Sequence, residues 1–310
     1  MISLNDFKEK EILFINTSDE NTKIRLENDN VVFEKEGNII NRLSCYKILA
    51  VFIIGDLTIT TKLIKNCINF GISIFLMKNN FEVYASIECK AEGNYLLRKK
   101  QYSSTDDLYM SKQIVKNKFL NQQYLLNNAI NSKNIVIKKI DHAEDSNSLL
   151  GIEGSFSKDF FKEYFKNINW YKREPRTKID INNLLLDIGY TYLFNYIDCL
   201  LRLYGFDNYK GFYHKLFFQR KSLSCDIVEP FRCIIDKQLV KSYNLKQINI
   251  NDFEFDGHRY MLEYNKSKKY TKIFFEAIID HKEDIFNYVY SFYRYVCDNK
   301  KYKFPIFNMK

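Results

Sequence analysis

The chain has 310 residues, which is enough for two domains with hydrophobic cores. With only 3 Pro and 10 Gly, it favours long helices over an all-β fold with many turns. The formal net charge of +9 indicates a polyanionic partner, above all nucleic acid, although the wealth of Asn, Ile, Tyr and Phe indicates that an AT-rich genome contributes to the lysine excess.

The cysteines and the apolar runs exclude several other classes. The seven cysteines are dispersed and never form a CxxC pair, which argues against a zinc ribbon and a disulfide framework. The N-terminal sequence MISLNDFKEKEILFIN lacks the uninterrupted apolar run of a signal peptide. No stretch approaches the ~18 apolar residues of a membrane span. We therefore expect a cytoplasmic protein with no membrane partner.

Residues 1–88 predict a small β-rich domain. Thr58 or Thr60 is the expected N-cap of one helix that ends before Gly71. Apolar or alternating runs separated by polar turns predict strands on both sides of that helix. The predicted strands are Glu11–Asn16, Lys23–Glu27, Val31–Lys35, Asn38–Leu43, Ile48–Ile54, Ile72–Met77 and Phe81–Glu88.

Residues 89–94 are the predicted linker, and residues 95–310 predict a larger all-α domain that carries the catalytic residues. Asp180 is a suitable N-cap and Gly205 a suitable stop for the most apolar helix. The predicted helices are Tyr95–Tyr102, Asp106–Asn128, Ser146–Lys166, Asp180–Tyr204, Ser222–Asn244 and Lys269–Asn299. The expected fold class is therefore α+β, with the β-rich domain first.

The stretch 211–232, GFYHKLFFQRKSLSCDIVEPFR, concentrates chemically useful side chains. Asp226 and Glu229 have i, i+3 spacing, which places both carboxylates on one face of a helix, although Pro230 would bend it. Two carboxylates and the imidazole of His214 suit Mg²⁺ or Mn²⁺. The flanking cations, which suit a phosphate ligand, are Arg220, Lys221 and Arg232. A surface helix with ordinary charges remains the alternative.

A second motif is GIEG, residues 151–154. Glu153 lies between two glycines, and small neighbours let a backbone or a ligand approach closely. The alternative is a solvated glutamate in a helix-terminal turn.

Four motifs occur in a fixed order: GIEG at 151–154, NNLLLDIGYTYL at 182–193, GFYH at 211–214 and SLSCDIVEPFR at 222–232. Together they resemble the CRISPR-associated adaptation integrase family, whose members insert new spacers into repeat arrays. The run LAVFIIGDLTITTKLIKNCINFGISIFLM at 49–77 and GNYLLRKKQY at 93–102 are also similar to that family. The resemblance extends from about residue 11 to about residue 295.

The resemblance implies a fold, a site and partners. It implies a β domain that forms the dimer and a helical catalytic domain whose metal ligands are Glu153, His214 and Glu229, with Asp226 assisting. The cofactor would be Mg²⁺ or Mn²⁺. The partners would be double-stranded DNA, a second copy in a homodimer, a tetramer on DNA, and a small second adaptation protein. Two departures, Cys233 after the arginine and Lys178 before Asp180, do not touch these ligands.

The implied reaction is a transesterification in which the 3′-hydroxyl of one DNA end attacks a phosphodiester, with endonuclease hydrolysis as the related activity. Two alternatives stay open: a structure-selective, metal-dependent nuclease in DNA repair, and a non-catalytic DNA-binding scaffold. Trp170 and Tyr171 suit either base stacking or core packing. Tyr190 suits either a hydroxyl near the site or core packing.

Overall fold

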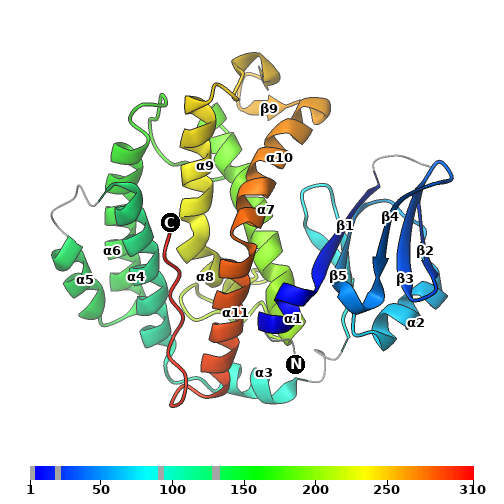
Figure 1. Cartoon of the computed structure of the whole chain (residues 1–310). Coiled ribbons are helices and arrows are strands. Elements are labelled where there is room, and N and C mark those ends of the chain that lie inside the picture. Colours follow the sequence, from blue (N-terminus) through cyan, green and yellow to red (C-terminus); the bar gives the residue numbers. More distant parts are fainter. Residues whose placement is uncertain (1–3, 18–21, 90–93, 128–132) are drawn as a thin grey trace. The chain divides into compact units, whose positions relative to one another are not determined.

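The computed structural model describes residues 4–17, 22–89, 94–127 and 133–310 (Figure 1). The chain divides into two compact units. The β unit comprises Met1–Tyr102 and Asp198–Asp207, and the helical unit comprises Ser103–Ile197 and Asn208–Lys310.

The β unit contains two sheets. The first has the order β1 (Glu11–Thr17), β5 (Ile48–Gly55), β6 (Ser73–Met77), β7 (Val83–Ile87), with β1, β5 and β6 parallel and β7 antiparallel. The second is the antiparallel sheet β2 (Thr22–Glu27), β3 (Asn30–Lys35), β4 (Asn38–Ser44). All seven predicted strands are confirmed to within about two residues at each end, the scatter expected of element boundaries.

The helix predicted between β5 and β6 is also confirmed. It is α2 (Thr61–Asn69), and a short helix α1 (Leu4–Glu9) that was not predicted precedes β1. Thr60 is the N-cap, because its side-chain oxygen accepts the Leu63 N–H at 3.2 Å. Strand β5 is buried along nearly its whole length, as expected for a parallel strand between two neighbours.

The boundary between the units differs from the predicted linker at 89–94, of which residues 90–93 lie outside the described residues. Helix α3 (Tyr95–Tyr102), predicted as the start of the catalytic domain, belongs to the β unit. The Asn94 side chain donates to the Tyr204 carbonyl, and Arg98 Nε donates to the Gly205 carbonyl, both at 2.9 Å. These bonds join α3 to residues 198–207, which end the longest helix.

The helical unit contains most of the predicted helices. They are α4 (Asp107–Leu125), α6 (Ser146–Tyr164), α7 (Ile181–Tyr204, whose end from Asp198 onward belongs to the β unit), α8 (Ser222–Val228), α9 (Arg232–Asn244), α10 (Tyr264–Asp280) and α11 (Lys282–Cys297). The unit also contains α5 (Lys133–Asp141), which was not predicted. The predicted helix Ser222–Asn244 is divided by a 3-10 turn, Glu229–Phe231, because Pro230 has no amide hydrogen. The predicted helix Lys269–Asn299 is divided at His281.

The prediction of an all-α second domain is wrong in one place. Strands β8 (Phe253–Phe255) and β9 (Tyr260–Leu262) form an antiparallel hairpin. Its connection contains Asp256-Gly257, and Gly257 has φ +91°, a backbone conformation that glycine adopts without strain. Asp-Gly between apolar runs is a strong hairpin pattern, so the sequence contained the information.

Helix α7 is apolar and largely buried. Asp180 caps it, accepting the Asn183 N–H at 2.7 Å, and Gly205 follows it with φ +83°, which confirms both predicted ends. Among the described residues α7 alone is long and apolar enough to cross a membrane, contrary to the expectation that no stretch approaches that length. Of the relevant window 78% is buried in the protein, as in the core helix of a water-soluble fold.

An extended segment at the C-terminus lies alongside α4 (Figure 1). Phe304, Phe307 and Met309 are buried. Asn117 exchanges two hydrogen bonds with the Phe307 backbone, at 2.6 and 2.9 Å, and Asn121 accepts the Met309 N–H at 2.9 Å. Two asparagine side chains of α4 therefore satisfy backbone groups of the segment and hold it against the helix.

We expect Gly189→Ala to destabilise the helical unit. A Cβ at Gly189 would lie 2.5 Å from Ile235 Cγ2 and 3.0 Å from the Phe274 ring, where α9 and α10 pack on α7. Overpacking of this kind costs about 1–3 kcal/mol in the free energy of unfolding.

The matched control is Gly151→Ala, since a Cβ there has no neighbour within 4 Å. This change should stabilise α6 by up to about 1 kcal/mol. Urea denaturation measures the free energy of unfolding of both variants. If Gly189→Ala and Gly151→Ala changed it by the same amount in the same direction, the described packing would be contradicted.

Candidate active site

The carboxylate of Asp226 organises the loop that carries His214. Its Oδ2 accepts the backbone N–H groups of Phe212 and Tyr213 at 2.6 and 3.0 Å, and its Oδ1 accepts the His214 N–H at 2.9 Å. Oδ1 also lies 2.7 Å from His214 Nδ1. Asp226 therefore fixes the imidazole with Nδ1 toward the protein, which leaves Nε2 for a ligand.

The same carboxylate lies so close to the start of the GFYH motif that only glycine fits at position 211. A Cβ at Gly211 would lie 2.7 Å from Asp226 Oδ2 and from the Ser222 backbone. No other residue type lets the loop approach α8 so closely.

Glu229 and Asp226 do not share partners, although their i, i+3 spacing predicted one common face. Asp226 lies in α8, whereas Glu229 begins the 3-10 turn at Pro230. Glu229 Oε1 accepts from Arg232 Nε at 3.0 Å. Asp226 therefore binds the loop that carries His214. Glu229 instead pairs with Arg232 and Lys118.

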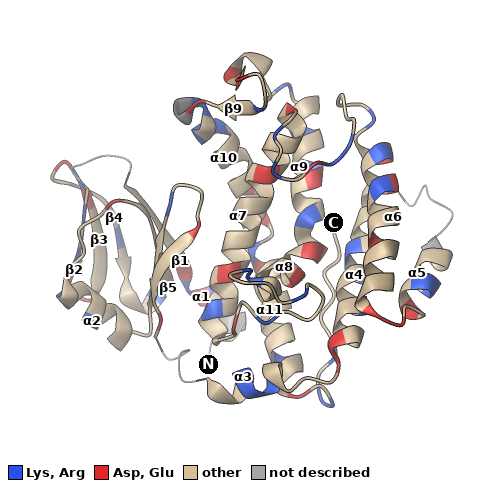
Figure 2. Ribbon diagram, turned by 180° about the vertical axis from the view of Figure 1, so that it is seen from behind, with Lys and Arg blue, Asp and Glu red and all other residues tan. Residues whose placement is uncertain are grey.

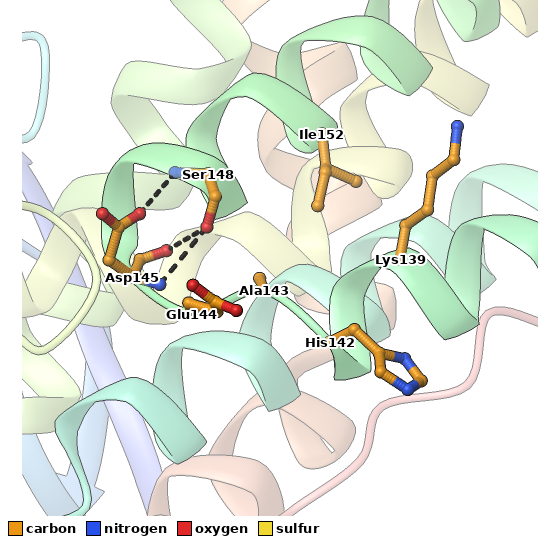
Figure 3. Close-up of a pocket in the computed structure, with 7 residues that line it drawn as sticks. All are labelled: Lys139, His142, Ala143, Glu144, Asp145, Ser148 and Ile152. Carbon is orange, nitrogen blue, oxygen red and sulfur yellow. Dashed lines mark hydrogen bonds between the residues drawn. The ribbon is translucent and has the colours of Figure 1, made fainter.

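Glu153 lies in the middle of α6, so the alternative of a solvated glutamate in a helix-terminal turn is wrong. Helix α6 begins much earlier, at a capping box in which Asp145 accepts the Ser148 N–H at 2.7 Å and the Ser148 side chain bonds back to the Asp145 backbone (Figure 3). A Cβ at Gly151 or at Gly154 would have no neighbour within 4 Å, so both glycines face open space.

Lys118 of α4 joins the two glutamates. Its ammonium donates to Glu229 Oε2 at 2.7 Å and to Glu153 Oε1 in a very short contact. The three side chains are 9%, 4% and 13% exposed, so the cluster is almost entirely removed from water. The Tyr213 hydroxyl donates to the other oxygen of Glu153, Oε2, at 2.6 Å.

Apolar packing holds the same elements together. The Tyr213 ring belongs to a buried cluster with residues of α4, α5 and α6, which places the His214 loop against those helices. Its other buried members are Val115, Phe119, Ile140, Ala143, Leu149 and Phe156.

The electrostatics of the cluster favour charged carboxylates. Burial by itself would raise the pKa of Glu229, but the charges of Arg232 and Lys118 outweigh it and lower the pKa to about 2. Burial would likewise lower the pKa of Lys118, but the two glutamates raise it above its usual range. Burial, and next the charge of Glu153, raise the pKa of Tyr213. The tyrosine hydroxyl therefore remains a donor.

A second buried network stands behind Arg232. Its guanidinium lies 4.7 Å from the centroid of the Tyr190 ring, and the Tyr190 hydroxyl donates to Asp236 Oδ1 at 2.5 Å. Burial raises the pKa of Asp236 to about 7. Tyr190 therefore lies in the core. It contacts Arg232, and Arg232 in turn binds Glu229.

The structure thus brings Glu153 and Glu229 to one cation, and His214 is near enough for its charge to lower the pKa of Glu229. In the part of the chain described, no three Asp, Glu, His or Cys side chains form a group that could hold a metal ion. Sequence analysis missed Lys118 and Tyr213. A lysine inside the predicted helix Asp106–Asn128, among apolar residues that face a core, was the available indication.

Other charged and aromatic features lie outside the cluster. Lys and Arg alternate with Asp and Glu over the helices (Figure 2), so charge density does not mark the site. Trp170 stacks on Phe161 and packs against Phe165, whereas Tyr171 is 81% exposed. A hollow of about 390 Å³ between α5 and α6 contains none of the predicted site residues (Figure 3). Its lining residues are Lys139, His142, Ala143, Glu144, Asp145, Ser148 and Ile152.

The fold and this cluster define an α+β protein whose helical unit holds two acids paired with one buried lysine, and a histidine paired with a third acid. Residues 15–276 match the family described as CRISPR associated protein Cas1, and the chain belongs to that family. The family resemblance stated from the four motifs is therefore confirmed.

Curated relatives match along most of their length. The CRISPR-associated endonuclease Cas1 1 of Thermodesulfovibrio yellowstonii is 28% identical in an alignment 283 positions long that covers 83% of this chain and 88% of the relative. The CRISPR-associated protein Cas1 3 of Methanobrevibacter ruminantium is 26% identical in an alignment 269 positions long that covers 77% of this chain and 80% of the relative.

Solved structures share the fold. A Cas1 protein from Thermotoga maritima has a TM-score of 0.71 at 17% identity, over 97% of this chain and 100% of the other. A casposase bound to integration product has a TM-score of 0.72 at 18% identity, over 94% of this chain and 92% of the other. A chain of a partial Cas6-RT-Cas1–Cas2 complex has a TM-score of 0.74 at 20% identity, over 97% of this chain and 100% of the other.

We expect Lys118→Met to lower the free energy of unfolding at pH 7 by about 3–5 kcal/mol, because it leaves buried carboxylates without their cation. Guanidinium denaturation measures the loss. The pKa of Glu229 in the folded parent is about 2, below the usual 4.5, so its charge stabilises the fold above pH 4.5 and that stabilisation is lost as the pH falls toward 2. The difference in the free energy of unfolding between variant and parent should therefore become smaller from pH 7 to pH 3. A difference that becomes larger in acid would contradict the ion-pair assignment.

Proposed function

We propose that this Cas1 family protein is a CRISPR adaptation integrase, which transfers a DNA 3′-hydroxyl to a phosphodiester in a repeat array and also acts as an endonuclease. The observation that carries the proposal is the convergence of Glu153 and Glu229 on one buried cation, next to a histidine oriented by Asp226. Membership of the Cas1 family and relatives named as endonucleases support it.

Glu153, His214 and Glu229 do not form a metal-holding group as they stand, but their donor atoms would suit a divalent cation once Lys118 has moved. The ammonium of Lys118 already shows that a positive charge is accepted between Glu153 and Glu229. Two carboxylates and the free Nε2 of His214 suit Mn²⁺ and, less well for the imidazole, Mg²⁺. Glu153, His214 and Glu229 would hold the ion after Lys118 moves aside. The bound ion would supply Lewis acidity and charge neutralisation at the phosphate.

The remaining side chains have positioning roles. Asp226 keeps the His214 ring in one orientation, and Arg232 keeps Glu229 charged and directed at the site. Tyr213 does the same for Glu153 through its hydroxyl. Lys118, once displaced, would be available to bind a phosphate oxygen as a point charge.

The arrangement argues against a non-catalytic scaffold. Burying ionised groups is costly, and a scaffold would be as stable or more stable with apolar residues in their place. The repair nuclease stays the second candidate, because hydrolysis needs the same side chains. An assay with free 3′-ends and a repeat-containing target separates the two.

We also propose double-stranded DNA and a small second adaptation protein as partners in the cytoplasm. A Cas1 chain with this fold occurs in a Cas1–Cas2 complex, which supports the second partner. Lysine and arginine contacts to phosphates would make binding to duplex DNA strongly dependent on salt.

Replacement of the proposed ligands should abolish strand transfer. We expect Glu153→Gln, Glu229→Gln and His214→Ala each to lower the rate of joining into a supercoiled repeat target by more than about 100-fold, because even neighbours of metal ligands contribute 10–100-fold. EDTA should abolish the reaction, and Mn²⁺ should support it at least as well as Mg²⁺. Asp226→Asn should lower the rate by about 10–100-fold as a positioning residue.

The control is Glu163→Gln, the same change on the solvent-exposed face of α6, which should leave the rate unchanged. Duplex DNA binding should survive all of these changes, because phosphate contacts come from other residues. Parental rates for Glu153→Gln and Glu229→Gln would contradict the site assignment.

We propose that the protein forms a homodimer through the β unit, with a tetramer on DNA. Apolar residues of β5 and β6 mainly fill the monomer's own core, but Ile39 and Ile40 of strand β4 are 49% and 58% exposed. Strand β4 lies at the edge of its sheet, where it is open to a partner. Light scattering at micromolar concentration should give a dimer, and a monomer would contradict the proposal.

A further inference from the structure

Asp236 of α9 is a buried acid that the reaction above leaves without a role. The residue is 0% exposed, and its Oδ1 accepts the Tyr190 hydroxyl at 2.5 Å. Its other oxygen, Oδ2, is also buried and has no hydrogen-bond partner within the described part of the chain. Buried polar atoms without partners are uncommon, and an unpaired carboxylate oxygen is especially costly. Asp236 is therefore not an ordinary core residue.

A continuous chain of contacts leads from Asp236 to Glu229. The Tyr190 hydroxyl donates to Asp236, and the guanidinium of Arg232 lies 4.7 Å from the centroid of the Tyr190 ring. Arg232 in turn donates to one carboxylate oxygen of Glu229, Oε1, from Nε and Nη2, both at 3.0 Å. Arg232 and Asp236 are four residues apart in α9, so they lie on the same face of that helix. Asp236 can therefore act on Glu229 without touching it.

Cations from three segments face Asp236. They come from its own helix, from α4 and from the segment before α7, and they are Arg232, Lys118 and Arg173. Burial raises the pKa of Asp236 to about 7, although the Tyr190 hydroxyl and these three charges oppose it. The carboxyl group therefore changes its charge near neutral pH.

Two further titratable groups face Asp236, the Tyr164 hydroxyl of α6 and the Cys233 thiol of α9. Burial, and next the charge of Asp236, raise the pKa of both. Both groups therefore stay neutral where Asp236 titrates, so that Asp236 alone changes charge among the groups named here.

A carboxylate in this place lowers the stability of the fold. The pKa of Asp236 in the folded protein is about 7, above the usual 3.8, so protonation favours the folded state and stability is lost as the pH rises from about 4 to about 7. An amide of the same shape would avoid this loss. Destabilising groups persist mainly where function needs them, which indicates that the charge of Asp236 serves the neighbouring site.

We propose that Asp236 is a positioning residue for Glu229, which it holds in place through the guanidinium of Arg232. The proposal rests on the proposed function for the role of Glu229. The negative charge of Asp236 attracts the guanidinium and keeps it against the Tyr190 ring, where it occupies Glu229 Oε1. Oε2, which accepts from Lys118, then keeps the orientation in which it would receive a divalent cation. Neutral Asp236 lacks this attraction, so the arrangement loosens below about pH 7.

The test measures strand transfer into the supercoiled repeat target across pH, for the parent and for Asp236→Asn. Asparagine has nearly the same shape but no charge, so it should lower the rate at about pH 8 by about 10–100-fold, the usual effect of losing a residue that orients a metal ligand. The ratio of the parental rate to the variant rate should fall toward one below about pH 6, where the parental Asp236 is also protonated. A residue needed only for packing would give a ratio that does not follow this titration.

Two readouts do not depend on catalysis. The affinity for Mn²⁺, measured from the EPR signal of the free ion, should fall by about 10–100-fold in Asp236→Asn at about pH 8. The melting temperature of the variant relative to the parent should rise from about pH 4 to about pH 7, because the variant lacks the buried carboxylate. Weaker metal binding in a protein that becomes relatively more stable separates positioning from a packing defect.

Tyr190→Phe tests the chain of contacts itself. Phenylalanine keeps the ring that Arg232 contacts but removes the hydrogen bond that lowers the pKa of Asp236. The pH at which the rate changes should therefore move upward relative to the parent. The matched control is Asp159→Asn, the same change at an exposed position of α6, which should leave the rate and its pH dependence unchanged.

Equal rates for the parent and Asp236→Asn at about pH 8 would overturn the proposal, and so would a ratio of rates that does not change with pH. If Asp236→Asn does not fold, Tyr190→Phe decides, since an unchanged pH dependence there also overturns the proposal. A parent that transfers strands while Asp236→Asn matches it refutes only the role of Asp236. A parent that neither transfers strands nor binds Mn²⁺ refutes the proposed function, and the role of Asp236 with it.

Discussion

The structure of the helical unit depends on the buried ion pairs of Lys118 with Glu153 and Glu229. Three elements that are distant in sequence supply these charges: α4, α6 and the 3-10 turn at Pro230. A buried charge without its partner costs several kcal/mol, so the three elements must take up their positions together. The C-terminal segment holds α4 at Asn117 and Asn121, on either side of Lys118 in the sequence, and so supports the same constraint.

This constraint connects stability to chemistry. The charges that keep Glu229 ionised in a nearly dry environment also prepare it for a divalent cation. Under the proposed function, the site would exchange Lys118 for a divalent cation, and Lys118 would stabilise the fold when the metal is not bound. The two glycines beside Glu153 face open space, and Asp226 presets the histidine.

Much of the fold could be predicted, because strand alternation, caps and glycine stops are local patterns. The strands of the β unit and the ends of α7 at Asp180 and Gly205 illustrate this. The hairpin at Asp256-Gly257 was missed although its pattern is local, since the helical interpretation was extended through it. Helix α3 packs on the end of α7 through side-chain hydrogen bonds, such as that from Arg98 to Gly205. These bonds join residues about a hundred positions apart, so local sequence patterns do not predict them.

Ordered motifs predicted Glu153, His214 and Glu229 as ligands and Asp226 as an assisting residue, but not the physical basis of the division between Asp226 and Glu229. That division depends on the turn at Pro230 and on backbone N–H groups, which carry no side-chain identity. Lys118 could not be found by spacing, because it meets its partners only through the packing of α4 against α6.

The most direct test of the account is the anomalous diffraction of crystals soaked in Mn²⁺. The account predicts a peak between the carboxylates of Glu153 and Glu229, with His214 Nε2 as a ligand and the Lys118 ammonium displaced. Crystals without a peak at that position, with Lys118 still joining the two glutamates at millimolar Mn²⁺, would contradict it.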